Sequence, residues 1–140
     1  MTIDNLKYPT MEAAASVLAK IGIDPSTRFD YLDQDFEYTS CRLEELDKYI
    51  ALYRKEDTSD KEKRLLGCYF TECLDEYLLN NDEPHPKQNE ALEIMYADQA
   101  IHQIELEYRK GAASDPDHWE IAKYIKLPSF LERISIFRFK

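Results

Sequence analysis

The sequence predicts an all-α protein: a single-domain bundle of five to seven helices over residues 1–140, with a short C-terminal strand as the alternative for the last residues. Three observations predict it. Only three glycines occur in 140 residues, whereas all-β proteins need glycine in most turns. A capping-box pattern precedes a long apolar stripe at residues 59–79. A proline and a glycine, Pro86 and Gly111, frame a further helical segment.

Two helices are expected in the N-terminal part. The first covers residues 10–20, where Thr10 can act as N-cap, three consecutive alanines favour helix, and Gly22 follows the end. An Asp-Pro pair then opens a turn or short helix. The next helix is expected over about residues 42–55. Its apolar residues recur at spacings of three and four: Leu43, Leu46, Tyr49, Ile50 and Tyr53.

The central helix is expected at residues 59–79. Ser59 and Glu62 form the capping box, in which the serine caps the helix and the glutamate three residues later reaches back. The apolar stripe that follows is the widest in the chain, so we place this helix at the centre of the core. A long helix from Pro86 to Lys110 should then pack against it in antiparallel fashion, because the connection is short.

The sequence of the C-terminal part predicts one helix and, after it, one element that can be either a helix or a strand. Asp115 can cap a helix that continues to about residue 126, where a Leu-Pro pair interrupts it. Ser129 and Glu132 repeat the capping-box pattern. Residues 134–139 also alternate loosely between apolar and polar side chains. A short apolar run does not separate helix from strand, so both remain open there.

The charge of the chain favours a basic partner. Asp and Glu number 28 and Lys and Arg 18, which gives a net charge of −10, and the first hundred residues carry all of the excess, since residues 101–140 have a charge of +1. Nucleic-acid binding is not expected, because phosphate contacts require clustered Lys and Arg. An acidic protein without a recognisable catalytic motif is more typical of a module that binds something basic than of an enzyme.

Cysteines and hydropathy predict a cytoplasmic protein. The chain lacks both an apolar run long enough for a transmembrane helix and an N-terminal secretory signal, so no membrane association is expected. The number of cysteines is odd and their spacing matches neither a disulfide framework nor a metal-binding or redox CxxC motif. They are expected to be buried, free thiols: Cys41, Cys68 and Cys73.

Two sets of residues could hold a metal ion, and neither is complete. The first set matches the oxygen-ligand positions of an EF-hand calcium loop: Asp33, Asp35, Glu37 and Glu44. Its sixth position, however, is Tyr38, where the loop requires glycine, and its ninth is Cys41, a poor ligand for calcium. The sequence therefore predicts no calcium site.

The second set lies on the expected long helix, where spacings of four and three bring Asp98, His102 and Glu105 to one face. No second histidine-bearing helix completes a metal site, and a hydrogen-bonded histidine on the helix surface is the simpler interpretation. The chain also lacks a nucleophile motif and a glycine-rich phosphate loop. We therefore expect no metal, no cofactor and no enzymatic activity, with an enzyme built on this set as a third alternative.

Two acidic segments are candidates for partner binding. The first mixes carboxylates with aromatic rings, a combination typical of protein interfaces: Asp30, Tyr31, Asp33, Asp35, Glu37 and Tyr38. The second lies on the polar face of the central helix: Glu72, Asp75 and Glu76. The competing interpretation is that Tyr31 and Phe36 belong to the core and that the carboxylates are merely solvated.

Three stretches resemble bacterial immunity proteins, which neutralise toxin domains delivered between neighbouring cells. They are the KRLLGCYF segment at residues 63–70, the Glu-Cys-Leu triplet at 72–74, and the tyrosine- and aspartate-rich segment at 30–38. The resemblance covers about half of the chain and includes no diagnostic motif. It implies a cytoplasmic inhibitor that binds a basic, nuclease-like toxin domain and covers its active site. A regulatory or scaffold module that binds another protein, including a phage-type inhibitor, is the alternative.

Overall fold

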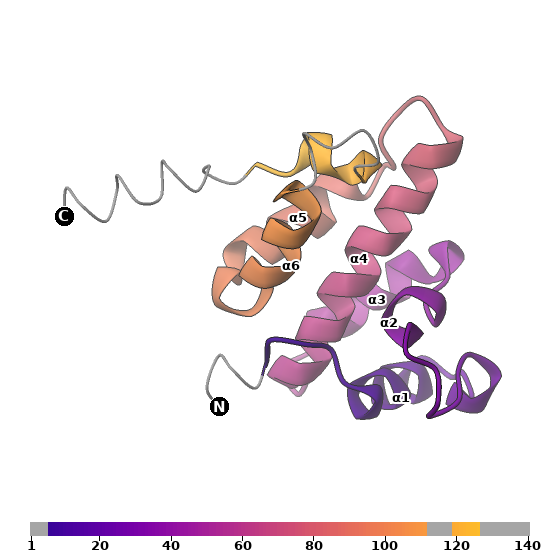
Figure 1. Cartoon of the computed structure of the whole chain (residues 1–140). Coiled ribbons are helices and arrows are strands. Elements are labelled where there is room, and N and C mark those ends of the chain that lie inside the picture. Colours follow the sequence, from indigo (N-terminus) through magenta and orange to yellow (C-terminus); the bar gives the residue numbers. More distant parts are fainter. Residues whose placement is uncertain (1–5, 112–118, 127–140) are drawn as a thin grey trace.

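The computed structural model describes residues 6–111 and 119–126. These residues form six α-helices and three short 3-10 helices, and no strand occurs among them. Figure 1 shows the long helix α4, Asp60–Asn80, running through the middle of the molecule with the other elements packed around it. The prediction of a single all-α bundle is therefore confirmed. The second capping box, at Ser129 and Glu132, and the alternative strand lie outside the described residues.

The N-terminal helix forms as its sequence predicts. α1 spans Met11–Lys20, and the Thr10 hydroxyl accepts a hydrogen bond of 3.1 Å from the Ala13 amide. Gly22 follows the helix with φ +86°, a left-handed conformation that glycine adopts without strain. Two short elements come next: η2, Pro25–Thr27, and α2, Phe36–Thr39.

The helix expected over residues 42–55 is interrupted near its start. A 3-10 turn, η3, covers Leu43–Glu45, and the α-helix α3 begins only at Leu46 and ends at Tyr53. The preceding residue, Arg42, is extended because its amide donates a hydrogen bond of 2.9 Å to the Tyr49 hydroxyl. This hydrogen bond keeps Arg42 out of the helix. The α-helix therefore starts at Leu46, three residues after the first apolar residue of the stripe, Leu43.

α4 is the centre of the core, as predicted. Its capping box is complete: the Ser59 hydroxyl accepts from the Glu62 amide at 3.2 Å, and the Glu62 carboxylate accepts from the Ser59 amide at 2.9 Å. Seven described elements, α1, α2, η3, α3, α5, α6 and η4, pack directly on α4. The three cysteines are buried and free, in agreement with the sequence prediction.

The long helix expected between Pro86 and Lys110 is two helices. α5 spans Gln88–Ala97, α6 spans Gln99–Gly111, and the break falls at Asp98, whose φ of −113° and ψ of 48° are not helical. The Tyr53 hydroxyl donates a hydrogen bond of 2.6 Å to the Asp98 carboxylate, and this contact with α3 holds the break in place. Further along the chain, a 3-10 helix, η4, covers Glu120–Tyr124 within the helix expected up to residue 126, whose expected cap, Asp115, lies outside the described residues.

α4 and α6 approach closely at Gly67. A Cβ atom added to Gly67 would lie 2.4 Å from Nδ1 of His102, far inside van der Waals contact. Only glycine therefore lets the His102 ring lie against α4, where the ring is completely buried. The position of one helix relative to the other depends on this pair.

We predict that Gly67→Ala lowers the free energy of unfolding by about 1–3 kcal/mol, since overpacking of a rigid core outweighs the helix propensity that alanine adds. Gly111→Ala is the matched control, because a Cβ at Gly111 meets nothing within 4 Å. That variant should be as stable as the parent or slightly more stable. Urea denaturation measures both, and equal stability of the two variants would contradict the close approach.

Candidate functional site

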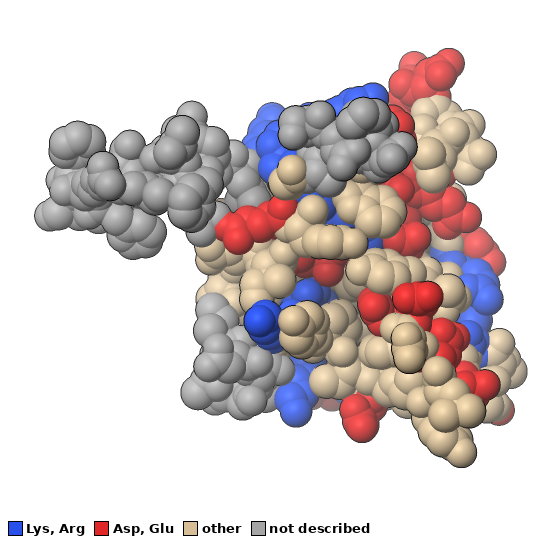
Figure 2. Space-filling view, viewed as in Figure 1, with Lys and Arg blue, Asp and Glu red and all other residues tan. Residues whose placement is uncertain are grey.

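A groove of about 420 Å³ lies between α2, the η3 turn and the C-terminal half of α4. We call it the acidic groove, because four carboxylates line it together with a single base. Its lining residues are Tyr38, Thr39, Cys41, Arg42, Leu43, Glu44, Glu72, Asp75, Glu76 and Leu79. Figure 2 shows acidic side chains along the side of the molecule on which α2 and the end of α4 lie in Figure 1.

The wall formed by α2 and η3 is held rigidly by a polar network. Both guanidinium nitrogens of Arg28 bind the Glu45 carboxylate, at 2.9 and 2.5 Å, and this contact lowers the pKa of Glu45 despite its burial. The same guanidinium donates to the Ser40 carbonyl at 2.9 Å. The Ser40 hydroxyl in turn lies 2.6 Å from the Tyr69 hydroxyl on α4. The wall is therefore fixed to the central helix on its inner side.

The wall formed by α4 presents its three acidic residues unequally. Glu76 is exposed, whereas the carboxylate of Glu72 accepts a hydrogen bond of 3.0 Å from Arg109. Burial raises the pKa of Glu72 more than Arg109 lowers it. Asp75 is only 5% exposed and accepts a hydrogen bond of 3.0 Å from the Ile121 amide. The competing interpretation, that these carboxylates are merely solvated, is therefore wrong for Asp75, which is buried and anchors η4 at the groove.

The remaining charges leave the groove negative. Arg42 is its only base, and its guanidinium donates to the carbonyls of Thr39 and Cys41 at 2.7 and 2.8 Å. Neither Glu44 nor Glu76 forms an ion pair within residues 6–111 and 119–126. Two exposed carboxylates are therefore available at the groove without competition from a base among the described residues.

The loop before α2 contains the other predicted set. Two aspartates fold it through hydrogen bonds to amides two residues later: Asp30 accepts from Leu32 at 2.8 Å and Asp33 from Asp35 at 3.1 Å. Tyr31 and Leu32 are 83% and 77% exposed. The alternative that places Tyr31 in the core is wrong, whereas the same alternative holds for Phe36, which is buried.

Tyr38 connects the two predicted sets. It lines the acidic groove beside Glu72, Asp75 and Glu76, so the end of the first set and the whole of the second meet at one place. Asp30, Tyr31 and Asp33 do not line the groove. Sequence analysis missed Leu79, which is 66% exposed at the rim. An exposed leucine at the polar end of a helix was the available signal for Leu79.

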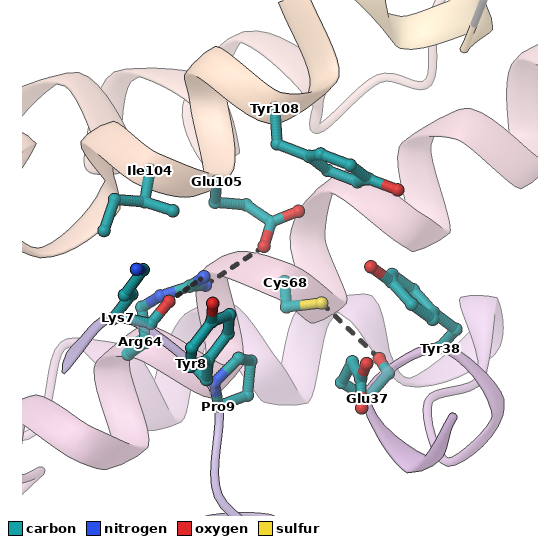
Figure 3. A pocket seen from close by; sticks show the side chains of 10 residues that line it. All are labelled: Lys7, Tyr8, Pro9, Glu37, Tyr38, Arg64, Cys68, Ile104, Glu105 and Tyr108. Carbon is teal, nitrogen blue, oxygen red and sulfur yellow. Dashed lines mark hydrogen bonds and ion pairs between the residues drawn. The ribbon is translucent and has the colours of Figure 1, made fainter. Parts of the chain in front are cut away.

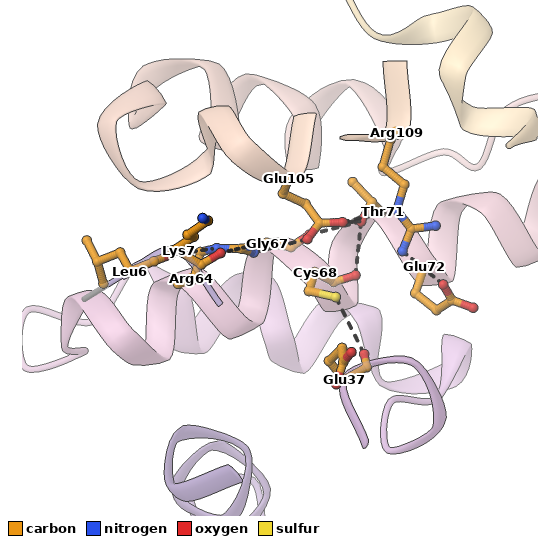
Figure 4. Close-up of polar contacts among 10 residues, drawn as sticks. All are labelled: Leu6, Lys7, Glu37, Arg64, Gly67, Cys68, Thr71, Glu72, Glu105 and Arg109. Atoms are coloured by element: carbon orange, nitrogen blue, oxygen red, sulfur yellow. Dashed lines mark hydrogen bonds and ion pairs between the residues drawn. The ribbon is translucent and has the colours of Figure 1, made fainter. Parts of the chain in front are cut away.

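The set Asp98, His102 and Glu105 is distributed over two internal networks. His102 is completely buried instead of lying on the helix surface, and its Nε2 is 2.7 Å from the Tyr53 hydroxyl, which also binds Asp98. Burial, with the nearby Arg64 charge, lowers the pKa of His102 to about 4. Glu105 is bound by Arg64 and Arg109, each at 3.0 Å (Figure 4). His102 and Glu105 are thus held by buried internal partners, whereas Asp98 is partly exposed.

Within the described part of the chain, no three His, Cys, Asp or Glu side chains are grouped so that they could hold a metal ion. No helix among the same residues is long and apolar enough to cross a membrane. No protein-family model, curated protein or solved structure matches the chain.

We predict that lowering the pH from about 6.5 to 4 destabilises the protein through His102. Its pKa is lower in the folded state than in the unfolded chain, so the unfolded state binds the extra proton in this window. The shift corresponds to about 3 kcal/mol at most. His102→Gln should remove this part of the pH dependence of unfolding. His85→Gln should retain it and lose only the contribution of His85 itself, whose pKa partial burial also lowers. An unchanged pH profile for His102→Gln would contradict the prediction.

Proposed function

We propose that this chain is an immunity-type protein inhibitor that binds a basic, nuclease-like toxin domain in the cytoplasm and neutralises it. The observation that carries the proposal is the acidic groove, in which exposed, unpaired carboxylates surround an aromatic ring and an exposed leucine. The resemblance of residues 30–38 and 63–74 to immunity proteins supports the same class.

The groove has the composition of a site for basic side chains. Glu44 and Glu76 can each pair with a Lys or Arg of the partner without first losing an internal ion pair. Tyr38 and Leu79 supply apolar contact area beside them. Apolar anchors contribute affinity, and surrounding charges steer association and fix the register of a complex.

The exposed loop at residues 30–35 adds a second contact. Tyr31 and Leu32 project large apolar side chains into solvent, which is unusual for residues without a binding role when several are adjacent. Asp30 and Asp35 are exposed beside them. A basic partner that fills the groove and covers this loop would meet two acidic patches, each with an apolar centre.

The alternative class, a regulatory or scaffold module, would use the same surface without blocking an active site. Co-expression separates the two. The gene adjacent to that of this chain, if it encodes a basic toxin domain, should arrest growth alone and not when this chain is present. A stable complex without protection from growth arrest would favour the regulatory module.

We predict that Glu44→Lys with Glu76→Lys abolishes protection and slows association with the toxin domain, most strongly at low salt. Because both residues are exposed, stability should change by less than about 1 kcal/mol. Surface plasmon resonance at two salt concentrations measures the association rate.

The matched control is Glu56→Lys with Asp57→Lys. This pair makes the same change in net charge at exposed positions before the first turn of α4, whereas Glu76 lies near its end. A defect equal in both double variants would mean that net charge alone matters and that the groove is not the interface. The loop variant Asp33→Lys with Asp35→Lys tests the second contact separately.

A further inference from the structure

A second cavity of about 280 Å³ opens beside the acidic groove and shares Tyr38 with it. We call it the tyrosine pocket, since three tyrosines, Tyr8, Tyr38 and Tyr108, line it (Figure 3). The N-terminal segment, α2, α4 and α6 each contribute residues. The other lining residues are Lys7, Pro9, Glu37, Arg64, Cys68, Ile104 and Glu105.

Three large apolar or aromatic side chains in the walls of the pocket are exposed to solvent. Tyr8 and Tyr108 are 69% and 54% exposed, and Ile104 is 39% exposed. None of the three was singled out in the sequence, although Ile104 and Tyr108 are four residues apart on α6 and therefore share one face. Exposed apolar side chains gathered around a cavity mark a binding surface more specifically than isolated ones.

Glu37 is the carboxylate of this pocket that has no basic partner among the described residues. Its carboxylate is half-buried and forms no ion pair with the described residues. Burial raises its pKa, and the neighbouring charges of Asp35, Glu105 and Asp33 raise it further. A cation bound at Glu37 would relieve both effects, because it would replace lost hydration and balance the surrounding negative charge.

The two bases in the lining do not serve Glu37. Each of the three guanidinium nitrogens of Arg64 already donates a hydrogen bond, to Glu105 or to the carbonyls of Leu6 and Lys7. Figure 3 shows Lys7 and Arg64 on one side of the pocket and Glu37, Tyr38 and Tyr108 on the other. The pocket therefore has an end with a carboxylate and two tyrosines where neither of its lining bases lies, although Arg109, which is not a lining residue, faces the Tyr38 ring.

Two tyrosine rings of this pocket already form cation–π contacts with basic side chains of the protein itself. The Lys7 ammonium lies 5.4 Å from the centre of the Tyr8 ring, and the Arg109 guanidinium carbon lies 5.4 Å from that of Tyr38. Cation–π contacts of this kind contribute most where the site is shielded from water. The rings, the free carboxylate and the tyrosine hydroxyls are together suited to a planar cation.

We propose that the tyrosine pocket takes an arginine side chain of the basic partner, with the guanidinium between Tyr38 and Tyr108 and paired to Glu37. This deepens the proposed function and rests on it. A guanidinium is planar, stacks on aromatic rings and donates several hydrogen bonds in fixed directions, whereas a lysine ammonium is a compact, strongly hydrated charge. Arginine is also among the residues that most often dominate interface energies.

The test uses N-acetyl-arginine amide as the probe and the neutral isostere N-acetyl-citrulline amide as its control. Titration of the isotope-labelled protein, followed by amide chemical shifts, should show arginine binding at Glu37, Tyr38, Ile104 and Tyr108. Citrulline should bind at least about tenfold more weakly, because its urea group carries no charge for Glu37. Equal binding of the two probes, or arginine shifts confined to the acidic groove, would overturn the proposal.

Two single variants make the test specific. Glu37→Gln, which keeps the size of the side chain, should weaken arginine binding about tenfold. Lys7→Gln removes a charge of opposite sign from the other side of the pocket and should bind arginine as tightly as the parent or more tightly. Weaker binding by Lys7→Gln, or unchanged binding by Glu37→Gln, would contradict the arrangement.

The toxin domain distinguishes this proposal from the proposed function. Glu37→Gln and Tyr108→Ala should each speed dissociation of the complex at least fivefold, since interface substitutions act mainly on dissociation. If neither changes the complex while Glu44→Lys with Glu76→Lys disrupts it, the proposed function stands and the tyrosine pocket is not part of the interface. If the chain binds no basic toxin domain yet discriminates arginine from citrulline, the tyrosine pocket is an arginine site and the proposed function is wrong.

Discussion

The structure depends on a buried chain of ion pairs between α4 and α6. Arg64 binds Glu105, Glu105 binds Arg109, and Arg109 binds Glu72, each at 3.0 Å (Figure 4). Burial alone would raise the pKa of Glu105, but the two guanidinium groups outweigh it and hold that pKa below its ordinary value. Removal of one partner from such a pair costs about 3–5 kcal/mol, because an uncompensated charge remains in the interior. This series of buried ion pairs therefore specifies how α6 lies on α4.

The same side chains place the walls of both cavities. Arg64 binds the carbonyl oxygens of two residues in the N-terminal segment that carries Tyr8. The Arg109 guanidinium lies 4.3 Å from the Trp119 ring centre, and so couples η4 to α6, and it also faces Tyr38 of α2. Glu72, the last residue in this series of ion pairs, lines the acidic groove. An acidic protein thus keeps two of its arginines inside, where they order the surfaces that carry its unpaired carboxylates.

Local signals were sufficient for much of this fold and failed where the determinant lies far away in sequence. The caps at Thr10 and Ser59 and the stripe of α4 involve neighbouring residues, and the structure confirms them. No glycine or proline marks the break at Asp98 in the sequence. The break is held by a hydrogen bond from Tyr53 of α3, which is distant in sequence. Likewise, the burial of Asp75 depends on the amide of a residue 46 positions away. A carboxylate appears as a surface residue in sequence until its distant partner is known.

Tyr38 is the residue at which the two proposed contacts become one surface. It lines both cavities, and the carboxylates that flank it, Glu37 on one side and Glu72 on the other, belong to different cavities. Arg109 faces Tyr38 and binds Glu72, so a partner cation near Glu72 would compete with an internal guanidinium, whereas one at Glu37 would not. Partner cations should therefore bind at Glu37, Glu44 and Glu76, where no internal ion pair opposes them. Such a division would let the buried network maintain the fold while the adjacent carboxylates bind the proposed partner.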